Sequence, residues 1–103
     1  MPKEATIRKN AIDILINGGW TTWFPFKSKW AKESDIFGAF DLIAWKENTI
    51  LFVQLTSYSN MAARRKKIQS FLDRTGVWLD RTKRAEVWGW MKWKKSFKII
   101  KME

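Results

Sequence analysis

Two apolar segments separated by a short polar turn constrain the fold of this chain most strongly. Residues 40–45 and 50–56 each have the composition of a β-strand, and Lys46-Glu47-Asn48 between them is short enough to make the strands antiparallel neighbours. The second segment is apolar almost without interruption until Gln54, which is typical of a strand buried on both faces. The sequence therefore predicts a sheet in which residues 50–56 form a central strand.

Polar residues lie at matching ends of these two strands. Asp41 comes early in the first strand, and Gln54 and Thr56 come late in the second. In an antiparallel pair the start of one strand lies beside the end of the other, and residues two apart point to the same face. We therefore expect Asp41 to lie near Gln54 and Thr56, with Asp35 in the preceding loop as a second carboxylate. Such oxygen donors suit a hard divalent cation beside a phosphate.

The rest of the chain completes a pattern of helices and strands. The further predicted elements are, in chain order, a helix over 3–17, a strand over 20–26, a helix over 61–74, and strands over 85–93 and 96–102. Gly18-Gly19 ends the first helix, and Pro25 places the first strand at a sheet edge. Ile68, Phe71 and Leu72 are expected to face the core. The order α–β–β–β–α–β–β predicts a single α/β domain over residues 1–103, with a mixed sheet flanked by two helices.

The net charge and the absence of two residue types limit the function. The chain has 20 Lys and Arg against 10 Asp and Glu, a net charge of +10, which predicts attraction to nucleic acid or to an anionic membrane, although the charge could simply confer solubility. It has no Cys and no His, which excludes disulfides, Cys/His zinc sites and catalysis by either side chain. Any metal must be held by oxygen atoms, as Mg²⁺ or Mn²⁺ is.

The expected location is the cytoplasm. No apolar run approaches the roughly 18 residues of a membrane span, and no secretory signal is visible at the start of the chain. The small size would suit a phage or mobile-element protein, for which the compartment would be the host cytoplasm.

A basic turn follows the central strand. Arg64, Arg65, Lys66 and Lys67 are consecutive and surround one turn of the second predicted helix with positive charge. Just before it, Ser57, Ser59 and Asn60 are expected to cap the helix, whose amino terminus also favours phosphate. The residues expected to contact a DNA backbone are Arg64, Arg65, Lys66, Lys67, Ser57 and Asn60. A second and weaker basic series comprises Lys92, Lys94, Lys95, Lys98 and Lys101.

These motifs resemble those of a known nuclease superfamily. With Asp41-Leu42-Ile43-Ala44, a 13-residue spacing to Gln54 and the basic helix that follows, the chain is similar to the PD-(D/E)XK nucleases over roughly residues 3–92, most of all to small Holliday-junction-resolvase-like and VRR-NUC-like members. The resemblance implies a restriction-endonuclease-like sheet and phosphodiester hydrolysis with Mg²⁺ or Mn²⁺. It also implies that Asp41 is the metal-ligating acid of the second strand.

The chain departs from that superfamily's pattern at two positions. Gln54 stands where a Glu or Asp is usual, and its neutral amide oxygen is a weaker ligand for a hard cation. Thr56 stands where a Lys is usual and carries no charge. The resemblance then implies a lysine from another element, with Lys29, Lys27 and Lys66 as candidates. The implied catalytic set is Asp41, Gln54, Thr56 and Lys29, and the implied metal ligands are Asp41, Gln54 and Asp35, while Glu4 is a remote candidate for a helix acid.

The resulting expectation is a structure-selective endonuclease that acts on branched or junction DNA as a homodimer, without membrane association. The aromatic residues around Trp88 and Trp90 are its expected dimer surface. The alternatives are a non-enzymatic nucleic-acid-binding module on the same fold and, less well supported, a Trp-rich cationic protein acting at membranes. Each site residue also has a structural alternative: Asp35 as the cap of a turn, Asp41 as the partner of a basic side chain, and Gln54 and Thr56 as the polar end of a buried strand.

Overall fold

The computed structural model describes residues 4–24, 36 and 39–102. Its elements are α1 (Glu4–Asn17), β1 (Thr21–Trp23), β2 (Leu42–Lys46), β3 (Thr49–Ser57), the short 3₁₀ helix η1 (Tyr58–Asn60), α2 (Met61–Thr75), β4 (Lys83–Met91) and β5 (Ser96–Lys101). This order confirms the predicted α/β class and the mixed sheet flanked by two helices. Within the described ranges, neither α-helix is both long enough and apolar enough to cross a membrane.

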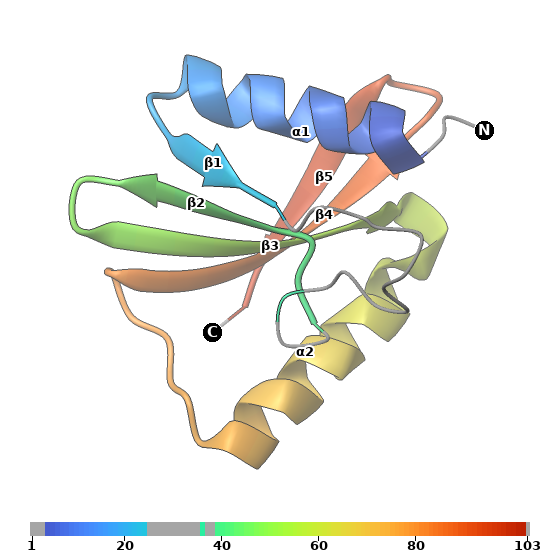
Figure 1. Cartoon of the computed structure of the whole chain (residues 1–103). Coiled ribbons are helices and arrows are strands. Elements are labelled where there is room, and N and C mark those ends of the chain that lie inside the picture. Colours follow the sequence, from blue (N-terminus) through green and yellow to red (C-terminus); the bar gives the residue numbers. More distant parts are fainter. Residues whose placement is uncertain (1–3, 25–35, 37–38, 103) are drawn as a thin grey trace, which may run out of the picture.

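The five strands form one sheet in the order β1-β2-β3-β4-β5. Neighbours are antiparallel except β3 and β4, which run parallel because α2 carries the chain back to the starting edge between them. The two helices cover opposite faces of the sheet, α1 on one and α2 on the other (Figure 1). β3 lies at the centre and β1 at an edge, both as predicted, although Pro25 itself falls outside the described residues.

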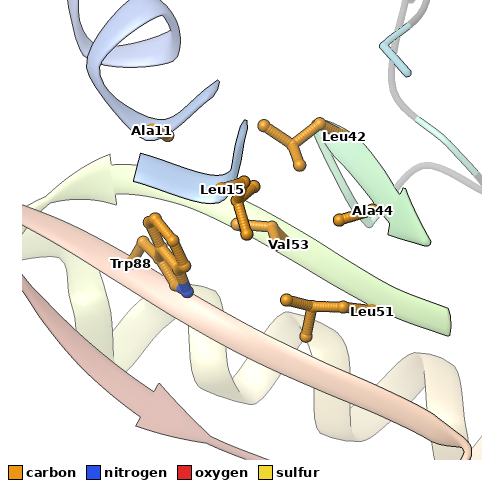
Figure 2. Packing of buried hydrophobic residues seen from close by; sticks show 7 residues of the cluster. All are labelled: Ala11, Leu15, Leu42, Ala44, Leu51, Val53 and Trp88. Carbon is orange, nitrogen blue, oxygen red and sulfur yellow. The ribbon is translucent and has the colours of Figure 1, made fainter. Parts of the chain in front are cut away.

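The first part of the core lies between α1 and the sheet. Its buried members are Ala11 and Leu15 from α1, Leu42 and Ala44 from β2, Leu51 and Val53 from β3, and Trp88 from β4. Figure 2 shows the Trp88 ring beside Leu15 and Val53. Trp88 is only 3% exposed, so the prediction of an exposed aromatic dimer surface around it is wrong. The half-buried Trp90 contacts Phe97 of β5, with ring centroids 5.0 Å apart.

The second part of the core lies between α2 and the opposite face. Ile68 and Leu72 of α2 are buried against Phe40, Ala85 and Val87, and the half-buried Phe71 packs against the same cluster, as predicted for that helix face. The odd and even residues of β3 are divided between the two clusters because successive side chains of a strand point to opposite faces. Phe52 packs on the α2 side. Gln54 and Thr56, in step with Phe52, therefore lie on the α2 side as well.

α2 begins at Met61, as predicted, but the side chains before it do not cap it by hydrogen bonds. Asn60 occupies the N-cap position of α2, as predicted, and Ser57 occupies that of η1, but neither makes a side-chain capping hydrogen bond. The chain passes through η1 instead, and Asn60 Nδ2 donates to Ser57 Oγ over 3.1 Å. Ser59 Oγ lies 3.3 Å from Ser57 Oγ. These polar side chains form hydrogen bonds with one another within the turn that connects β3 to α2.

A glycine in β4 allows α2 to begin close to the sheet. A Cβ atom at Gly89 would overlap the Sδ and Cγ atoms of Met61, the buried first residue of α2. We therefore expect Gly89→Ala to lower the free energy of unfolding by about 1–3 kcal/mol, because the Met61 side chain must move within a packed core. Denaturant unfolding measures the change.

The matched control for that substitution is Gly18→Ala. A Cβ at Gly18 meets its nearest atom at 3.4 Å, an ordinary contact, and we expect a much smaller change there. Equal stability losses in the two variants would show that the Met61 contact does not set the position of α2.

Candidate functional site

Asp41 and Gln54 are brought together by the register of β2 and β3. Leu42 pairs with Val53, so the residue before Leu42 lies beside the residue after Val53. Gln54 Nε2 donates a hydrogen bond of 2.8 Å to Asp41 Oδ2, which confirms the predicted proximity of the two side chains. Asp41 immediately precedes β2 rather than lying inside it, but its backbone N–H still donates to Val53 O over 2.8 Å.

The Asp41 carboxylate is held by two donors from β3. Besides Gln54, the backbone N–H of Leu55 donates to Asp41 Oδ2 over 2.7 Å. Gln54 Nε2 donates in turn to the Leu55 carbonyl oxygen over 3.0 Å. Both partners of Nε2 are acceptors, which fixes the orientation of the amide with its nitrogen toward Asp41. The arrangement anchors the carboxylate to the central strand and turns the Gln54 amide oxygen away from that carboxylate.

The Gln54 amide oxygen is the unusual atom of this site. Gln54 is 3% exposed, and its buried Oε1 has no hydrogen-bond partner in the described part of the chain. A buried acceptor without a partner costs roughly 1–3 kcal/mol, so native proteins rarely leave one without a reason. An acceptor oxygen in this position requires a donor group, a water molecule or a cation.

The oxygen atoms of Asp41 and Gln54 are of the chemical kind that a magnesium site uses. Mg²⁺ is commonly bound through one or two carboxylates together with water and phosphate oxygens. The Asp41 carboxylate and the Gln54 amide oxygen, from adjacent strands, supply two hard oxygen donors. No group of three acidic side chains suited to a metal occurs among the residues that the structure describes. Asp35, the predicted second carboxylate, lies outside those residues, as do Lys27 and Lys29.

Thr56 lies two residues beyond Gln54 on the same face of β3. It is 7% exposed and pairs with Gly89, the position where Met61 packs. Its hydroxyl cannot replace the charge of a lysine. Glu4 belongs to α1, which covers the opposite face of the sheet (Figure 1). Any lysine that serves this site must therefore come from another element of the chain.

The predicted backbone-binding residues lie at the end of β3 and on α2. Arg65, Lys66 and Lys67 are exposed, and Arg64 is half-buried. Ser57 is half-buried and Asn60 exposed at the junction before the helix. The sequence from 48 to 72 contains no acidic residue, so the net charge of this segment is positive. The positive charge of this segment therefore lies on α2, which follows Gln54 in the sequence.

The buried carboxylate of Glu86 was missed by the sequence analysis. Glu86 in β4 is 4% exposed, accepts from Arg84 NH2 over 3.0 Å through Oε2, and accepts from Trp88 Nε1 over 2.9 Å through Oε1. The i, i+2 spacing of Arg84, Glu86 and Trp88 in an alternating strand was the available signal. Glu86 pairs with Val53 and so lies on the α1 side of the sheet, away from Gln54. Both its oxygens have partners, which makes it a structural residue.

No protein-family model matches the chain, and no curated protein matches it.

Proposed function

We propose that the chain is a metal-dependent, structure-selective DNA endonuclease that hydrolyses phosphodiester bonds at the Asp41–Gln54 pair. The observation that carries this proposal is the Gln54 amide oxygen, buried without a partner beside a carboxylate that β3 holds in place. Sites used only for structure rarely leave such an oxygen without a protein or water partner. A carboxylate held in place on a strongly basic domain, next to a residue whose buried acceptor lacks a partner, supports a role in phosphate chemistry.

In this proposal the residues of the chain divide the work. The Leu55 N–H and the Gln54 amide N–H keep the Asp41 carboxylate in one position. The Asp41 carboxylate would hold Mg²⁺ or Mn²⁺, and Gln54 Oε1 would accept from a water molecule beside the ion. The bound metal would stabilise charge on the phosphate and make bound water a better nucleophile. The buried position of Gln54 limits access of bulk water, so electrostatic interactions at the pair are stronger than at the surface.

The basic residues favour DNA as the substrate. A net charge of +10 raises the local concentration of a polyanion, and Arg64 to Lys67 would contact phosphates rather than bases. Affinity for DNA should then fall steeply as salt rises, since each neutralised phosphate releases counterions. A junction offers two equivalent strands for cutting, so the proposal includes a homodimer, with a surface other than the one around the buried Trp88.

Cleavage of an end-labelled four-way junction and of a matched linear duplex tests the proposal. We expect the wild-type protein to cut the junction with Mg²⁺ or Mn²⁺, to cut the duplex more slowly, and to cut neither with EDTA. Cleavage that persists in EDTA would contradict a metal-dependent reaction.

A non-catalytic DNA-binding module on the same fold is the second candidate. Two observations favour it: an amide at position 54 in place of an acid, and an uncharged Thr56 in place of a lysine. Binding that is unchanged in EDTA, with no cutting under any metal condition, would support the module. In that case Asp41→Ala should leave affinity intact or raise it, because it removes a negative charge from the DNA-facing region.

A further inference from the structure

An aromatic and basic surface lies at the end of the sheet where β3 stops and β4 turns into β5. We call it the hairpin patch, and its members are Tyr58, Lys92, Trp93, Lys94, Lys95 and Lys98. Trp93 is 61% exposed and Tyr58 is 41% exposed. Their rings meet edge to face with centroids 5.0 Å apart, and Lys98 Nζ lies 5.6 Å from the Tyr58 ring centroid.

The fold assembles the hairpin patch from segments far apart in the sequence. β3 and β4 run parallel, so their carboxyl ends lie at the same edge of the sheet, with Ser57 opposite Trp90. Tyr58 follows β3 directly, while residues 92–95 form the turn between β4 and β5. Lys98 returns on β5 opposite Gly89. Tyr58 contacts the Trp93 ring on one side, and much of the Trp93 ring remains exposed.

The charge around these rings has one sign. Residues 87–102 contain five lysines and no acidic residue, and the segment from 48 to 72 that carries Tyr58 also has none. Such a surface attracts an anion, and the exposed rings add a flat apolar area to it. Positively charged grooves that carry exposed aromatic rings are a common arrangement for single-stranded nucleic acid, where bases stack on the rings.

Core packing does not account for Trp93. The chain buries Trp88 to 3% exposure in the same hairpin, yet it leaves Trp93 mostly in water between Lys92 and Lys94. A membrane-inserting turn needs a larger apolar area than one ring among lysines. One ring is sufficient for an unpaired base, and the flanking lysines match the phosphates on either side of that base.

We infer that the hairpin patch binds unpaired DNA, with one base stacked on Trp93 and the adjoining phosphates held by its lysines. The inference rests on the proposed function only in taking DNA as the ligand, since the patch uses none of the residues of the Asp41–Gln54 pair. It gives the chain a means of favouring DNA that has unpaired bases, such as a branch point or a single-stranded end, over a continuous duplex.

Binding of a fluorescein-labelled oligothymidine, followed by anisotropy in EDTA, tests the inference. We expect Trp93→Ala to weaken binding by about tenfold, the effect of losing one stacked base, and to change the affinity for a duplex of equal length by less than about twofold. Trp93→Phe should retain most of the affinity because it keeps a flat ring. The matched control is Trp78→Ala, at a tryptophan that is 78% exposed between α2 and β4, and it should bind like wild type.

Three results would overturn the inference. The first is unchanged oligothymidine binding in Trp93→Ala, and the second is an equal loss for oligothymidine and duplex. The third is a loss of binding to vesicles containing phosphatidylglycerol while oligothymidine binding stays constant, which would assign the patch to a membrane surface. EDTA keeps this test separate from cleavage. If the protein cuts junctions but Trp93→Ala does not weaken oligothymidine binding, only the inference about the hairpin patch fails. If Trp93→Ala weakens binding but the protein never cuts DNA, only the proposed nuclease activity fails.

Discussion

Gln54→Glu is expected to destabilise the protein strongly at neutral pH in EDTA, by about 3 kcal/mol. The substitution removes the N–H groups that donate to Asp41 Oδ2 and to the Leu55 carbonyl, and it places a second carboxylate against both acceptors. The loss should shrink in acid, where one of the two carboxyl groups is protonated and can donate to the other. Addition of Mg²⁺ should recover stability at neutral pH, because a cation between two carboxylates relieves their repulsion.

Thermal unfolding with and without Mg²⁺ measures both effects, and a second glutamine provides the control. Gln69 Nε2 donates to Asp73 Oδ1 over 2.9 Å on the exposed surface of α2, so Gln69→Glu creates the same chemical change in water. We expect the free energy of unfolding of that variant to fall by less than about 0.5 kcal/mol and not to change when Mg²⁺ is added. If Mg²⁺ raises the stability of Gln54→Glu no more than it raises that of Gln69→Glu and wild type, the Asp41–Gln54 pair is not a cation site.

Phe40→Ala is expected to lower the free energy of unfolding by about 3–5 kcal/mol. Phe40 is 2% exposed, and its ring lies 5.2 Å from that of Phe52 and 5.9 Å from that of Phe71. An apolar, partly open pocket of about 290 Å³ already adjoins these three rings, so the deletion would enlarge a space that the neighbouring side chains do not fill. Because Phe40 directly precedes Asp41, the variant should also loosen the carboxylate.

Chemical denaturation measures that loss, with Trp78→Ala as the control, since it removes a large aromatic side chain that is 78% exposed. We expect the control to change stability by less than about 0.5 kcal/mol. A similar small change for Phe40→Ala would mean that the α2 side of the core does not depend on the packing of these rings.

Much of the fold was predictable from local patterns. The continuous apolar run before Gln54 indicated a central strand, and the short turn at 46–48 set the antiparallel register that brings Asp41 to Gln54. The amphipathic spacing of Ile68, Phe71 and Leu72 indicated which side of α2 is buried. Each of these signals depends on residues close together in the chain, because a buried sheet face or helix face requires apolar residues at a regular spacing.

The errors came from features that depend on distant residues. Trp88 and Trp90 lie on the same face of β4, and the sequence does not say how much of that face a helix covers. α1 covers the face that carries Trp88, so that ring is buried. Ser57 and Asn60 have the composition of helix caps, but the turn through η1 gives them partners in each other. The unpartnered Gln54 oxygen and the Tyr58–Trp93 contact likewise required the assembled sheet to become visible.

The most direct measurement of the central claim compares wild type with Asp41→Asn on one labelled four-way junction in Mn²⁺. Asparagine keeps an oxygen that can accept from the Leu55 N–H, so the variant should fold, which its circular dichroism and thermal unfolding verify. We expect its cleavage rate to fall by about 100-fold or more, because a metal-binding carboxylate contributes several kcal/mol to the reaction. Equal cleavage by both proteins, or tight junction binding by both without any cleavage, would contradict an endonuclease centred on Asp41.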